Sequence, residues 1–268
     1  MPFLVMVEWR ELKASHSCAA DRRKPLNADP LDGAARGPRM LSASVFATFA
    51  EDGYVVTPVV FSRSEILVVR KECERIRART GGWIVLGAAR ENARLFEFVK
   101  HDVFQRICTM TIGSDADLFF EGILHKPSRG GRELRWHQDS GYGRTDPSFI
   151  SCWLPLSTGS AAAGGLWVAP GSHVLGPIKH TRSPATSEQY AGPVSETIPA
   201  ASRPLDLALG QVVVLHSELL HRTGPNETDI DRLSFQCGFA GASTRFLDDG
   251  LPADHRVPIF RSPTESAV

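Results

Sequence analysis

A histidine and an aspartate stand one residue apart in the segment RWHQDSGY, residues 135–142. Side chains at positions i and i+2 of an extended strand point to the same face, so His137 and Asp139 can meet at one point if the strand continues to Asp139. Imidazole and carboxylate groups are common metal ligands. Two polar residues at the end of a strand are also an ordinary surface feature, and a metal would need at least a third ligand from elsewhere in the chain.

Two histidines that follow a strongly apolar run are candidates for this third ligand. The segment VVVLHSELLHRTGPN contains His216 and His221. Either of them would join His137 and Asp139 to give two imidazoles and one carboxylate. This ligand set suits non-haem Fe(II) and leaves one side of the metal open for oxygen chemistry.

An arginine and a serine lie further along the chain, in DRLSFQCGF. Arg232 and Ser234 would share one face of an expected strand. A guanidinium with a hydroxyl beside it can hold a carboxylate in an apolar pocket. Two interpretations of Arg232 are open, an anchor for a carboxylate-containing ligand and a salt bridge to an acidic side chain of the protein itself, because a buried unpaired arginine is costly.

The first part of the chain after residue 40 has helical patterns. We expect a short helix that ends at Gly53 and a strand over 54–56. A capping-box pattern of Ser62 and Glu65 predicts a helix over 62–80. Helical character continues over 91–113. The buried faces of these helices are expected to contain Ile66, Val69, Cys73, Ile76, Leu95, Phe98, Val99 and Phe104.

The pattern changes to short β-rich runs after about residue 117. These runs cover residues 117–127, 132–139, 149–157, 164–170, 208–216 and 232–241, and Gly, Pro, Ser and Asp clusters separate them. Helices followed by a series of strands predict an α+β domain, a jelly roll flanked by N-terminal helices. The polar stretch 177–203 is long enough to serve as a lid or a binding loop.

The ordered motifs LHKPSRGGRELRWHQDSGY, CWLPLS, GGLWVAPGSHVLGP and LLHRTGPNETDIDRLSF closely resemble the phytanoyl-CoA dioxygenase family of Fe(II)/2-oxoglutarate-dependent oxygenases. The likeness spans roughly residues 53–239. It implies a cupin-like double-stranded β-helix core. It also implies that His137, Asp139 and His221 bind Fe(II), and it favours His221 over His216.

The same resemblance assigns the cosubstrate site. Arg232 matches the arginine that pairs with the far carboxylate of 2-oxoglutarate. Residues that fall at other cosubstrate positions are Lys126, Trp153, Thr223 and Ser234. We expect a turn-stabilising or pocket-lining role for His173. For His216 we expect either a packing role or support of a metal ligand. Trp136 and Tyr142 flank the metal pair, where they would line the pocket or belong to the core.

The chemistry implied by this resemblance is oxidation of a C–H bond. Fe(II), 2-oxoglutarate and O2 would be the cofactors, with succinate and CO2 released. Hydroxylation is the expected outcome, and epimerisation, cyclisation and desaturation are the alternatives that begin in the same way. A redox-neutral cupin-like metalloenzyme and a binding module without catalysis are the rival classes.

Composition limits the kinds of partner. The 30 basic and 30 acidic residues balance, so no net field attracts nucleic acid or an anionic membrane, and a small molecule is the expected substrate. No stretch reaches the roughly 18 apolar residues of a membrane span. The five cysteines are odd in number and widely spaced, which predicts reduced thiols and a cytoplasmic protein. The excess of arginine over lysine, with abundant alanine, suggests a GC-rich bacterial genome. For a bacterial protein of this kind, the resemblance to the phytanoyl-CoA dioxygenase family implies a secondary metabolite as substrate.

The expected organisation is a disordered leader over residues 1–40 and one oxygenase domain over 41–268. The leader is rich in Ala, Arg, Asp, Pro and Gly and has no apolar period. Met40 is a plausible alternative translation start. We expect the folded protein to be a monomer or a homodimer.

Overall fold

A computed structural model describes residues 41–184, 192–247 and 256–262. These residues belong to one compact unit, Ala35–Val268. The expected leader, residues 1–40, lies outside the described residues, so the domain boundary stays a prediction. Within the described ranges, no helix has the length and apolar character needed to cross a membrane.

The helices begin and end near the positions that the sequence predicts. Helix α2 (Phe49–Asp52) ends at Gly53, whose φ of 75° suits glycine. Helix α3 (Arg63–Thr80) starts with the expected capping box, in which Ser62 and Glu65 satisfy each other's backbone N–H groups. The single helical stretch expected over 91–113 is instead two helices, α4 (Ala93–Val99) and α5 (Asp102–Thr111). The break occurs because the His101 imidazole caps α5 by accepting from Val103 N at 3.2 Å.

Two antiparallel sheets form the β structure. The larger has seven strands in the order β1-β11-β6-β13-β3-β15, with β2 paired to β3, and the smaller has the order β10-β7-β12-β4. Their bounds are β1 (Tyr54–Val56), β2 (Ile84–Leu86), β3 (Ala116–Lys126), β4 (Leu134–His137), β6 (Ile150–Pro155), β7 (Leu166–Val168), β10 (Arg203–Pro204), β11 (Val213–His216), β12 (His221–Thr223), β13 (Arg232–Gly241) and β15 (Val257–Phe260). Two short pairs, β5 (Thr145–Asp146) with β14 (Arg245–Phe246) and β8 (His180–Ser183) with β9 (Gly192–Ser195), complete the strands.

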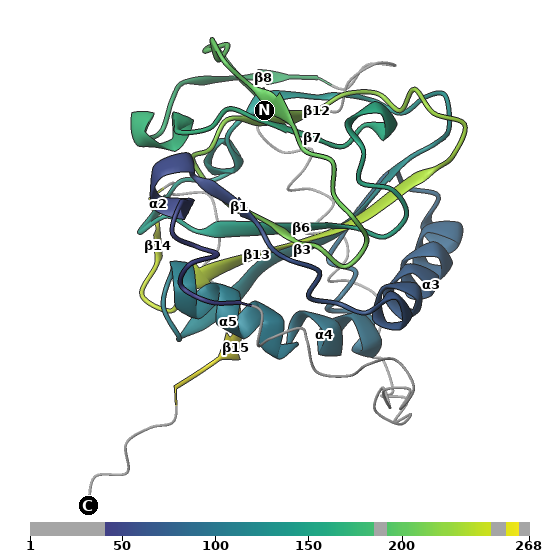
Figure 1. Ribbon diagram of the computed structural model, residues 1–268, viewed down its shortest axis with the longest axis horizontal. Helices are drawn as coiled ribbons and strands as arrows, with labels where there is room; N and C mark the ends of the chain where they lie inside the picture. Colours follow the sequence, from purple (N-terminus) through teal and green to yellow (C-terminus); the bar gives the residue numbers. More distant parts are fainter. Residues whose placement is uncertain (1–40, 185–191, 248–255, 263–268) are drawn as a thin grey trace, which may run out of the picture. The chain divides into compact units, whose positions relative to one another are not determined.

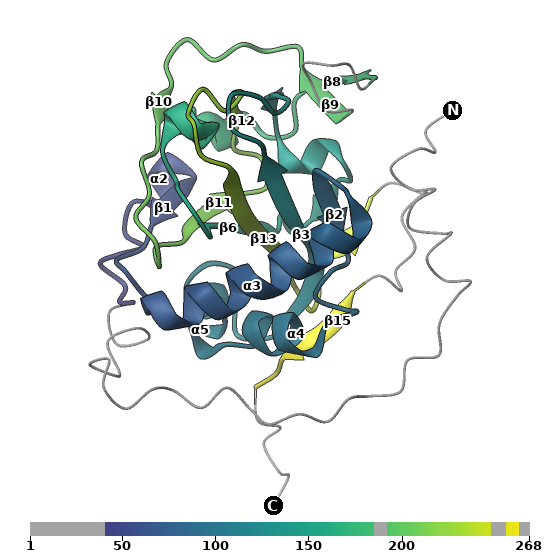
Figure 2. The same cartoon turned by 90° about the vertical axis from the view of Figure 1, so that its right-hand side faces the viewer.

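Helices α3, α4 and α5 lie along one face of the larger sheet, and the smaller sheet faces its other side (Figures 1 and 2). Two facing antiparallel sheets with helices on the outside confirm the expected jelly-roll core. The helical layer also explains why the strands of the larger sheet are buried on both faces.

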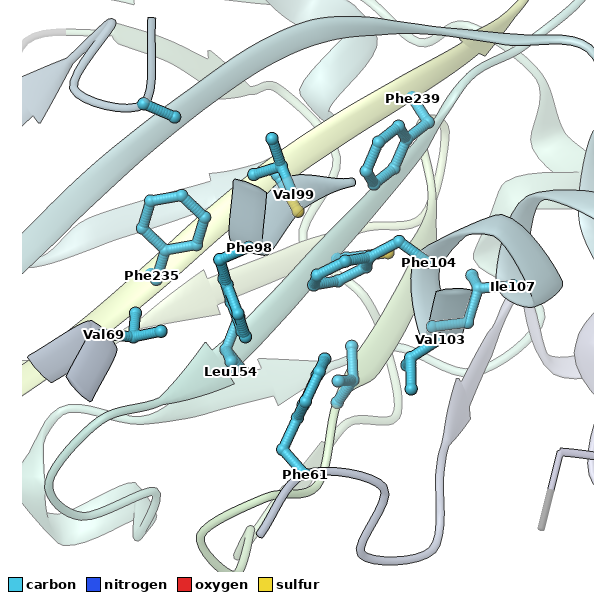
Figure 3. Packing of buried hydrophobic residues seen from close by; sticks show 14 of the residues in the cluster. Phe61, Val69, Phe98, Val99, Val103, Phe104, Ile107, Leu154, Phe235 and Phe239 are labelled. Carbon is cyan, nitrogen blue, oxygen red and sulfur yellow. The ribbon is translucent and has the colours of Figure 1, made fainter. Parts of the chain in front are cut away.

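Two hydrophobic clusters occupy the two faces of the larger sheet. One packs α3–α5 against the sheet and includes Phe98, Phe104, Phe235 and Phe239 (Figure 3). All eight residues expected on the buried helical faces are in this cluster, as are the four free cysteines among the described residues, Cys73, Cys108, Cys152 and Cys237. The other cluster lies between the two sheets and is formed by Tyr54, Trp153, Leu166, Val168, Leu205, Leu207, Val213, Leu215 and Leu219.

Strand alternation identifies the residues that point between the sheets. In β13, Phe235, Cys237 and Phe239 belong to the helix-facing cluster. Because side chains alternate along a strand, Arg232 and Ser234 point the other way, toward the smaller sheet. The inward face of the larger sheet therefore carries Arg232 and Ser234, two of the residues expected to bind the cosubstrate.

Candidate metal and cosubstrate site

Two histidines from neighbouring strands of the smaller sheet meet directly. His137 at the end of β4 and His221 at the start of β12 are Cα partners in the antiparallel register. Directly opposed residues share a face, and the two imidazole centroids are 4.3 Å apart. Both side chains are buried.

Asp139 joins this pair by a different route from the one expected. The strand ends at His137, Gln138 stays extended, and Asp139 begins a 3-10 turn, η3 (Asp139–Gly141). Its Oδ1 nevertheless lies 3.8 Å from His137 Nε2 and 3.6 Å from His221 Nε2. In the described part of the chain, this is the one group of at least three His, Cys, Asp or Glu side chains whose ligand atoms all lie within 4.8 Å of one another.

The hydrogen bonds of the two imidazoles leave one nitrogen of each ring free for a metal. His137 Nδ1 donates to Arg135 O at 2.7 Å, and His221 Nδ1 donates to Leu219 O at 3.0 Å. Each Nε2 therefore carries a lone pair directed toward Asp139. Burial, assisted by the neighbouring His221, lowers the pKa of His137 to about 3, so this imidazole is neutral.

The donor set fits a divalent iron. Two imidazole nitrogens and one carboxylate oxygen are the 2-His-1-carboxylate arrangement of non-haem Fe(II) sites. The distances from Asp139 Oδ1 to the two Nε2 atoms are too long for hydrogen bonds. They suit three ligand atoms that each lie about 2 Å from one shared ion. The three buried side chains thus form a candidate metal site.

Two further residues hold the metal-ligand segment in place, and the sequence analysis missed both. Ser151 Oγ, on β6, donates to Asp139 Oδ2. The Gln138 amide donates to Gly176 O at 2.9 Å and to Glu218 O at 2.7 Å and accepts from Ile178 N at 2.9 Å. Ser151 could have been found from the period of two, because it precedes the expected inward residue Trp153 by two positions.

A second polar cluster, on the inward face of the larger sheet, contains two buried basic side chains. Arg232 on β13 and Lys126 on β3 are directly opposed Cα partners, and both side chains are almost completely buried. Arg232 donates to Ser234 Oγ at 2.5 Å and to Gly164 O at 2.9 Å. Its guanidinium carbon lies 5.6 Å from the centre of the Trp153 ring. The expected cosubstrate residues Arg232, Ser234, Lys126 and Trp153 are therefore together.

Lys126 is held by neutral oxygens. Its Nζ donates to Thr223 Oγ1 at 2.8 Å and to Gly224 O, so Thr223 also belongs to this cluster. Burial, with a contribution from the adjacent Arg232, lowers the pKa of Lys126 well below its usual range. Like charges that face each other across two strands are unfavourable. A bound anion would offset this repulsion and restore the charged form of the ammonium group.

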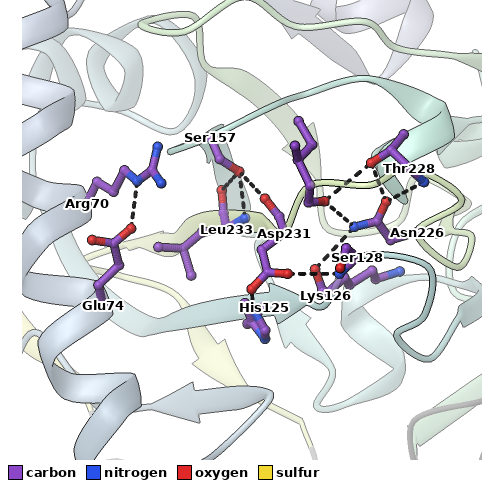
Figure 4. A network of polar contacts seen from close by, with 11 residues as sticks. Arg70, Glu74, His125, Lys126, Ser128, Ser157, Asn226, Thr228, Asp231 and Leu233 are labelled. Atoms are coloured by element: carbon purple, nitrogen blue, oxygen red, sulfur yellow. Dashed lines mark hydrogen bonds and ion pairs between the residues drawn. The ribbon is translucent and has the colours of Figure 1, made fainter.

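The turn between β12 and β13 is hydrogen-bonded to the end of β3, beside Lys126 (Figure 4). The Asn226 amide donates to Lys126 O at 3.3 Å and to Ile230 O at 2.8 Å. Asp231 pairs with His125 Nε2 at 2.9 Å and accepts from Ser128 N at 2.9 Å. These bonds join the start of β13 to the end of β3, so the two cationic side chains emerge side by side.

The two clusters lie on facing sheets and are joined through β12, because Thr223 follows His221 by two positions and accepts from Lys126 Nζ at 2.8 Å. Ser151, which contacts Asp139, is the cross-strand partner of Gly238, and Trp153, beneath the Arg232 guanidinium, is the partner of Gln236. Residues two apart in a strand are neighbours on one face. Trp153, which contacts the Arg232 guanidinium, is thus the neighbour on this face of Ser151, which contacts Asp139.

Several other expectations for the site need correction or refinement. Trp136 does not line the pocket, because the alternation of β4 directs it to the opposite face from His137, where Arg222 stacks between Trp136 and Trp167 at 5.5 and 4.8 Å. Tyr142 does lie beside the site, with its ring 5.8 Å from that of His137.

His173 and His216 lie next to each other rather than with the triad. Their rings are 5.1 Å apart, and His173 Nε2 donates to Ala50 O at 3.1 Å in α2. His216 Nδ1 accepts from Glu218 N at 3.2 Å, and burial lowers the pKa of His216 to about 4. These contacts agree with the expected packing and turn-stabilising roles.

The stretch 177–203 is not a structureless loop. It contains β8, β9 and the start of β10, and residues 185–191 lie outside the described residues. The hairpin packs on the metal-ligand segment, since Gln138 N donates to His180 Nε2 at 3.0 Å. A Cβ on Gly141 would lie 3.0 Å from Pro193 Cβ. Its use as a lid stays a prediction.

A pocket of about 180 Å³ lies where this hairpin meets η3. It begins at Ser140, the residue after Asp139, and extends to His180 at the start of β8. Its lining residues are Ser140, Gly141, Arg144, Pro177, Ile178 and His180. The pocket is small for a ligand site, and its lining does not include the three candidate metal ligands.

Comparison with known proteins agrees with the class that the fold and donor set define. The model of the phytanoyl-CoA dioxygenase (PhyH) family matches residues 49–234. The chain therefore belongs to the phytanoyl-CoA dioxygenase family, which consists of Fe(II)/2-oxoglutarate-dependent oxygenases.

Curated relatives match part of the chain. Phytanoyl-CoA dioxygenase 1 of Oryza sativa subsp. japonica is 31% identical over 111 residues, which are 41% of this chain and 39% of the relative. Ectoine dioxygenase of Stutzerimonas stutzeri is 26% identical over 153 residues, 50% of this chain and 51% of the relative. The 1-deoxypentalenic acid 11-beta-hydroxylase of Streptomyces exfoliatus is 33% identical over 99 residues, or 34% of each. The matched segments span about a third to a half of these relatives.

Solved structures share the fold over most of the chain. The non-haem monooxygenase ThoJ has a TM-score of 0.69 at 22% identity and covers 82% of this chain and 85% of its own. The 2-oxoglutarate-dependent carbocyclase SnoK from nogalamycin biosynthesis has a TM-score of 0.67 at 18% identity, covering 83% and 98%. The epimerase SnoN, solved with Fe3+, 2-oxoglutarate and nogalamycin RO, has a TM-score of 0.66 at 21% identity, covering 82% and 95%.

Proposed function

We propose that this chain is a non-haem Fe(II)/2-oxoglutarate-dependent dioxygenase that oxidises a C–H bond of a small molecule. The observation that carries the proposal is the space between the two sheets, which has two polar parts. A buried His-Asp-His cluster lies beside a buried pair of cations. The first part suits Fe(II) and the second suits the far carboxylate of a dicarboxylic oxoacid.

His137, Asp139 and His221 are the proposed metal ligands. With both Nδ1 atoms committed to backbone carbonyls, the two imidazoles keep their orientation and present only Nε2. When bound, iron and 2-oxoglutarate supply the oxidising power, with O2 consumed and succinate and CO2 released. The protein holds the donor atoms in place and keeps the surrounding space apolar.

Arg232 is the proposed anchor for the far carboxylate. Ser234 and Gly164 hold its guanidinium while it lies over Trp153, and Lys126 adds a second positive charge bonded to Thr223. A dianion bound here would face two cations in a buried setting where charge-assisted hydrogen bonds are strong. The apolar cluster around Trp153 excludes water from this end of the site.

The proposed substrate is a bacterial secondary metabolite, and hydroxylation is the proposed outcome. The fold shared with proteins of nogalamycin biosynthesis and the match to a Streptomyces hydroxylase support this choice. Epimerisation and cyclisation are the second candidate outcome, because SnoN and SnoK, which share the fold, carry those activities. The pocket beside η3 is the proposed entrance for the substrate.

Two measurements on the purified protein test the proposal. Under anaerobic conditions, addition of Fe(II) and then 2-oxoglutarate should produce the visible charge-transfer absorption of a chelated oxoacid. Admission of O2 should then yield succinate. A redox-neutral metalloenzyme or a binding module would form no succinate, and an Arg232→Ala variant of the former would keep its activity.

A further inference from the structure

The two oxygens of the Asp139 carboxylate have different surroundings. Oδ1 faces the two histidines, at 3.8 Å from His137 Nε2 and 3.6 Å from His221 Nε2. Oδ2 accepts the hydrogen bond from Ser151 Oγ. One oxygen is therefore directed to the metal position and the other is already occupied by a protein donor.

Ser151 is well placed to fix this difference. It lies in β6, which is paired on one side with β11 and on the other with β13, so its backbone is anchored in the interior of the sheet. Its side chain is completely buried. Its cross-strand partners are Leu215 and Gly238, which offer no polar side-chain atoms. The carboxylate of Asp139 is the polar group that the hydroxyl meets.

Aromatic packing also restricts the space around Ser151. A Cβ on Gly238 would lie 2.1 Å from Cε1 of Phe120, so the Phe120 ring covers this glycine. Gly238 is the cross-strand partner of both Phe120 and Ser151. The ring therefore lies over the residue opposite Ser151 on β13, and Leu215 is the residue opposite Ser151 on β11. Between two apolar neighbours the donor has a strong preference for the carboxylate.

We propose that Ser151 is a positioning residue that restricts Asp139 to a single metal-binding oxygen. The proposal rests on the proposed function of the site. A carboxylate whose two oxygens are both free can bind a metal through one oxygen or both. A second bound oxygen would take a coordination position that 2-oxoglutarate needs. By engaging Oδ2, Ser151 keeps that position available for the cosubstrate.

The test compares three variants with the parent. Ser151→Ala removes the hydroxyl, Ser151→Thr keeps it, and Ser217→Ala is the control. Ser217 is also buried, and its Oγ has no hydrogen-bond partner among the described residues. Fe(II) affinity is measured by competition with a chelating dye, and 2-oxoglutarate affinity by anaerobic titration of the charge-transfer absorption.

Ser151→Ala should weaken Fe(II) binding by about 10- to 100-fold, the usual effect of removing a group that orients a metal ligand. At saturating Fe(II), its dissociation constant for 2-oxoglutarate should rise by about tenfold or more, since a released carboxylate competes for the same position. Ser151→Thr should restore both affinities to within a few-fold of the parent, and Ser217→Ala should equal the parent.

Parent-like affinities in Ser151→Ala would overturn the proposal. The proposal would also be overturned if Ser151→Thr had the folding stability of the parent but bound Fe(II) and 2-oxoglutarate as weakly as Ser151→Ala. If Ser151→Ala does not fold, Ser151→Cys takes its place, because a thiol is a weak donor of similar size; parent-like 2-oxoglutarate binding by Ser151→Cys would then overturn it. A parent protein that gives neither the absorption nor succinate refutes the proposed function instead.

Discussion

Replacement of Arg232 by methionine tests the cosubstrate site most directly. The substitution removes a fully buried guanidinium but keeps an unbranched side chain over Trp153. It also removes the donors to Ser234 Oγ and Gly164 O. Because these contacts lie outside the His-Asp-His triad, Fe(II) affinity should change by no more than a few-fold.

The expected loss of 2-oxoglutarate affinity is large. Removal of one member of a buried charge pair costs about 3–5 kcal/mol, because the other charge is left without its partner. At about 1.4 kcal/mol for each factor of ten, the dissociation constant should rise by at least about 100-fold. Lys126 is the remaining cation and keeps the loss toward the lower end of this range.

Anaerobic titration with 2-oxoglutarate at saturating Fe(II) measures the effect. Arg129→Met is the matched control, since Arg129 lies near Lys126 but forms an exposed ion pair with Asp229 at 2.6 Å, a kind of pair worth about 0–1 kcal/mol. If Arg232→Met binds 2-oxoglutarate within threefold of the parent, the assignment of the carboxylate anchor is wrong.

Three further predictions concern the ligands, the buried lysine and a glycine. His221→Ala should abolish tight Fe(II) binding, whereas His216→Ala should retain it; equal losses in the dye-competition assay would contradict the ligand assignment. In the unfolded chain the Lys126 ammonium group keeps its proton up to about pH 10.4. In the folded chain burial lowers the pKa of Lys126, so the group loses that proton at a lower pH. Folding stability without 2-oxoglutarate should therefore rise with pH below that value, and Lys126→Met should flatten the rise in urea unfolding. Gly164→Ala should lower the free energy of unfolding by about 1–3 kcal/mol more than Gly87→Ala. Both glycines have positive φ, but only the new Cβ at residue 164 would meet a neighbour, at 2.7 Å from Lys126 Cδ. Equal urea midpoints of the two variants would refute this.

Local patterns predicted helix α3 and the face of β13, but not every element. The capping box at Ser62 and the apolar stripe of α3 follow from the backbone geometry of a single helix. The alternation of β13 placed Arg232 and Ser234 on one face, as the structure has them. The break at His101 was missed because a histidine side chain capping a helix has no strong sequence signal.

The sequence by itself determined which residues could bind a metal and an oxoacid, since side-chain chemistry and the order of motifs are written in the chain. Only the tertiary structure decided which of them meet. The register of β12 on β4 opposes His221 to His137, and that of β13 on β3 opposes Arg232 to Lys126. Strand pairing between distant segments depends on long-range packing, and a shift of one residue would turn each side chain to the other face. The same reason explains why the contact between Ser151 and Asp139 became visible only in three dimensions.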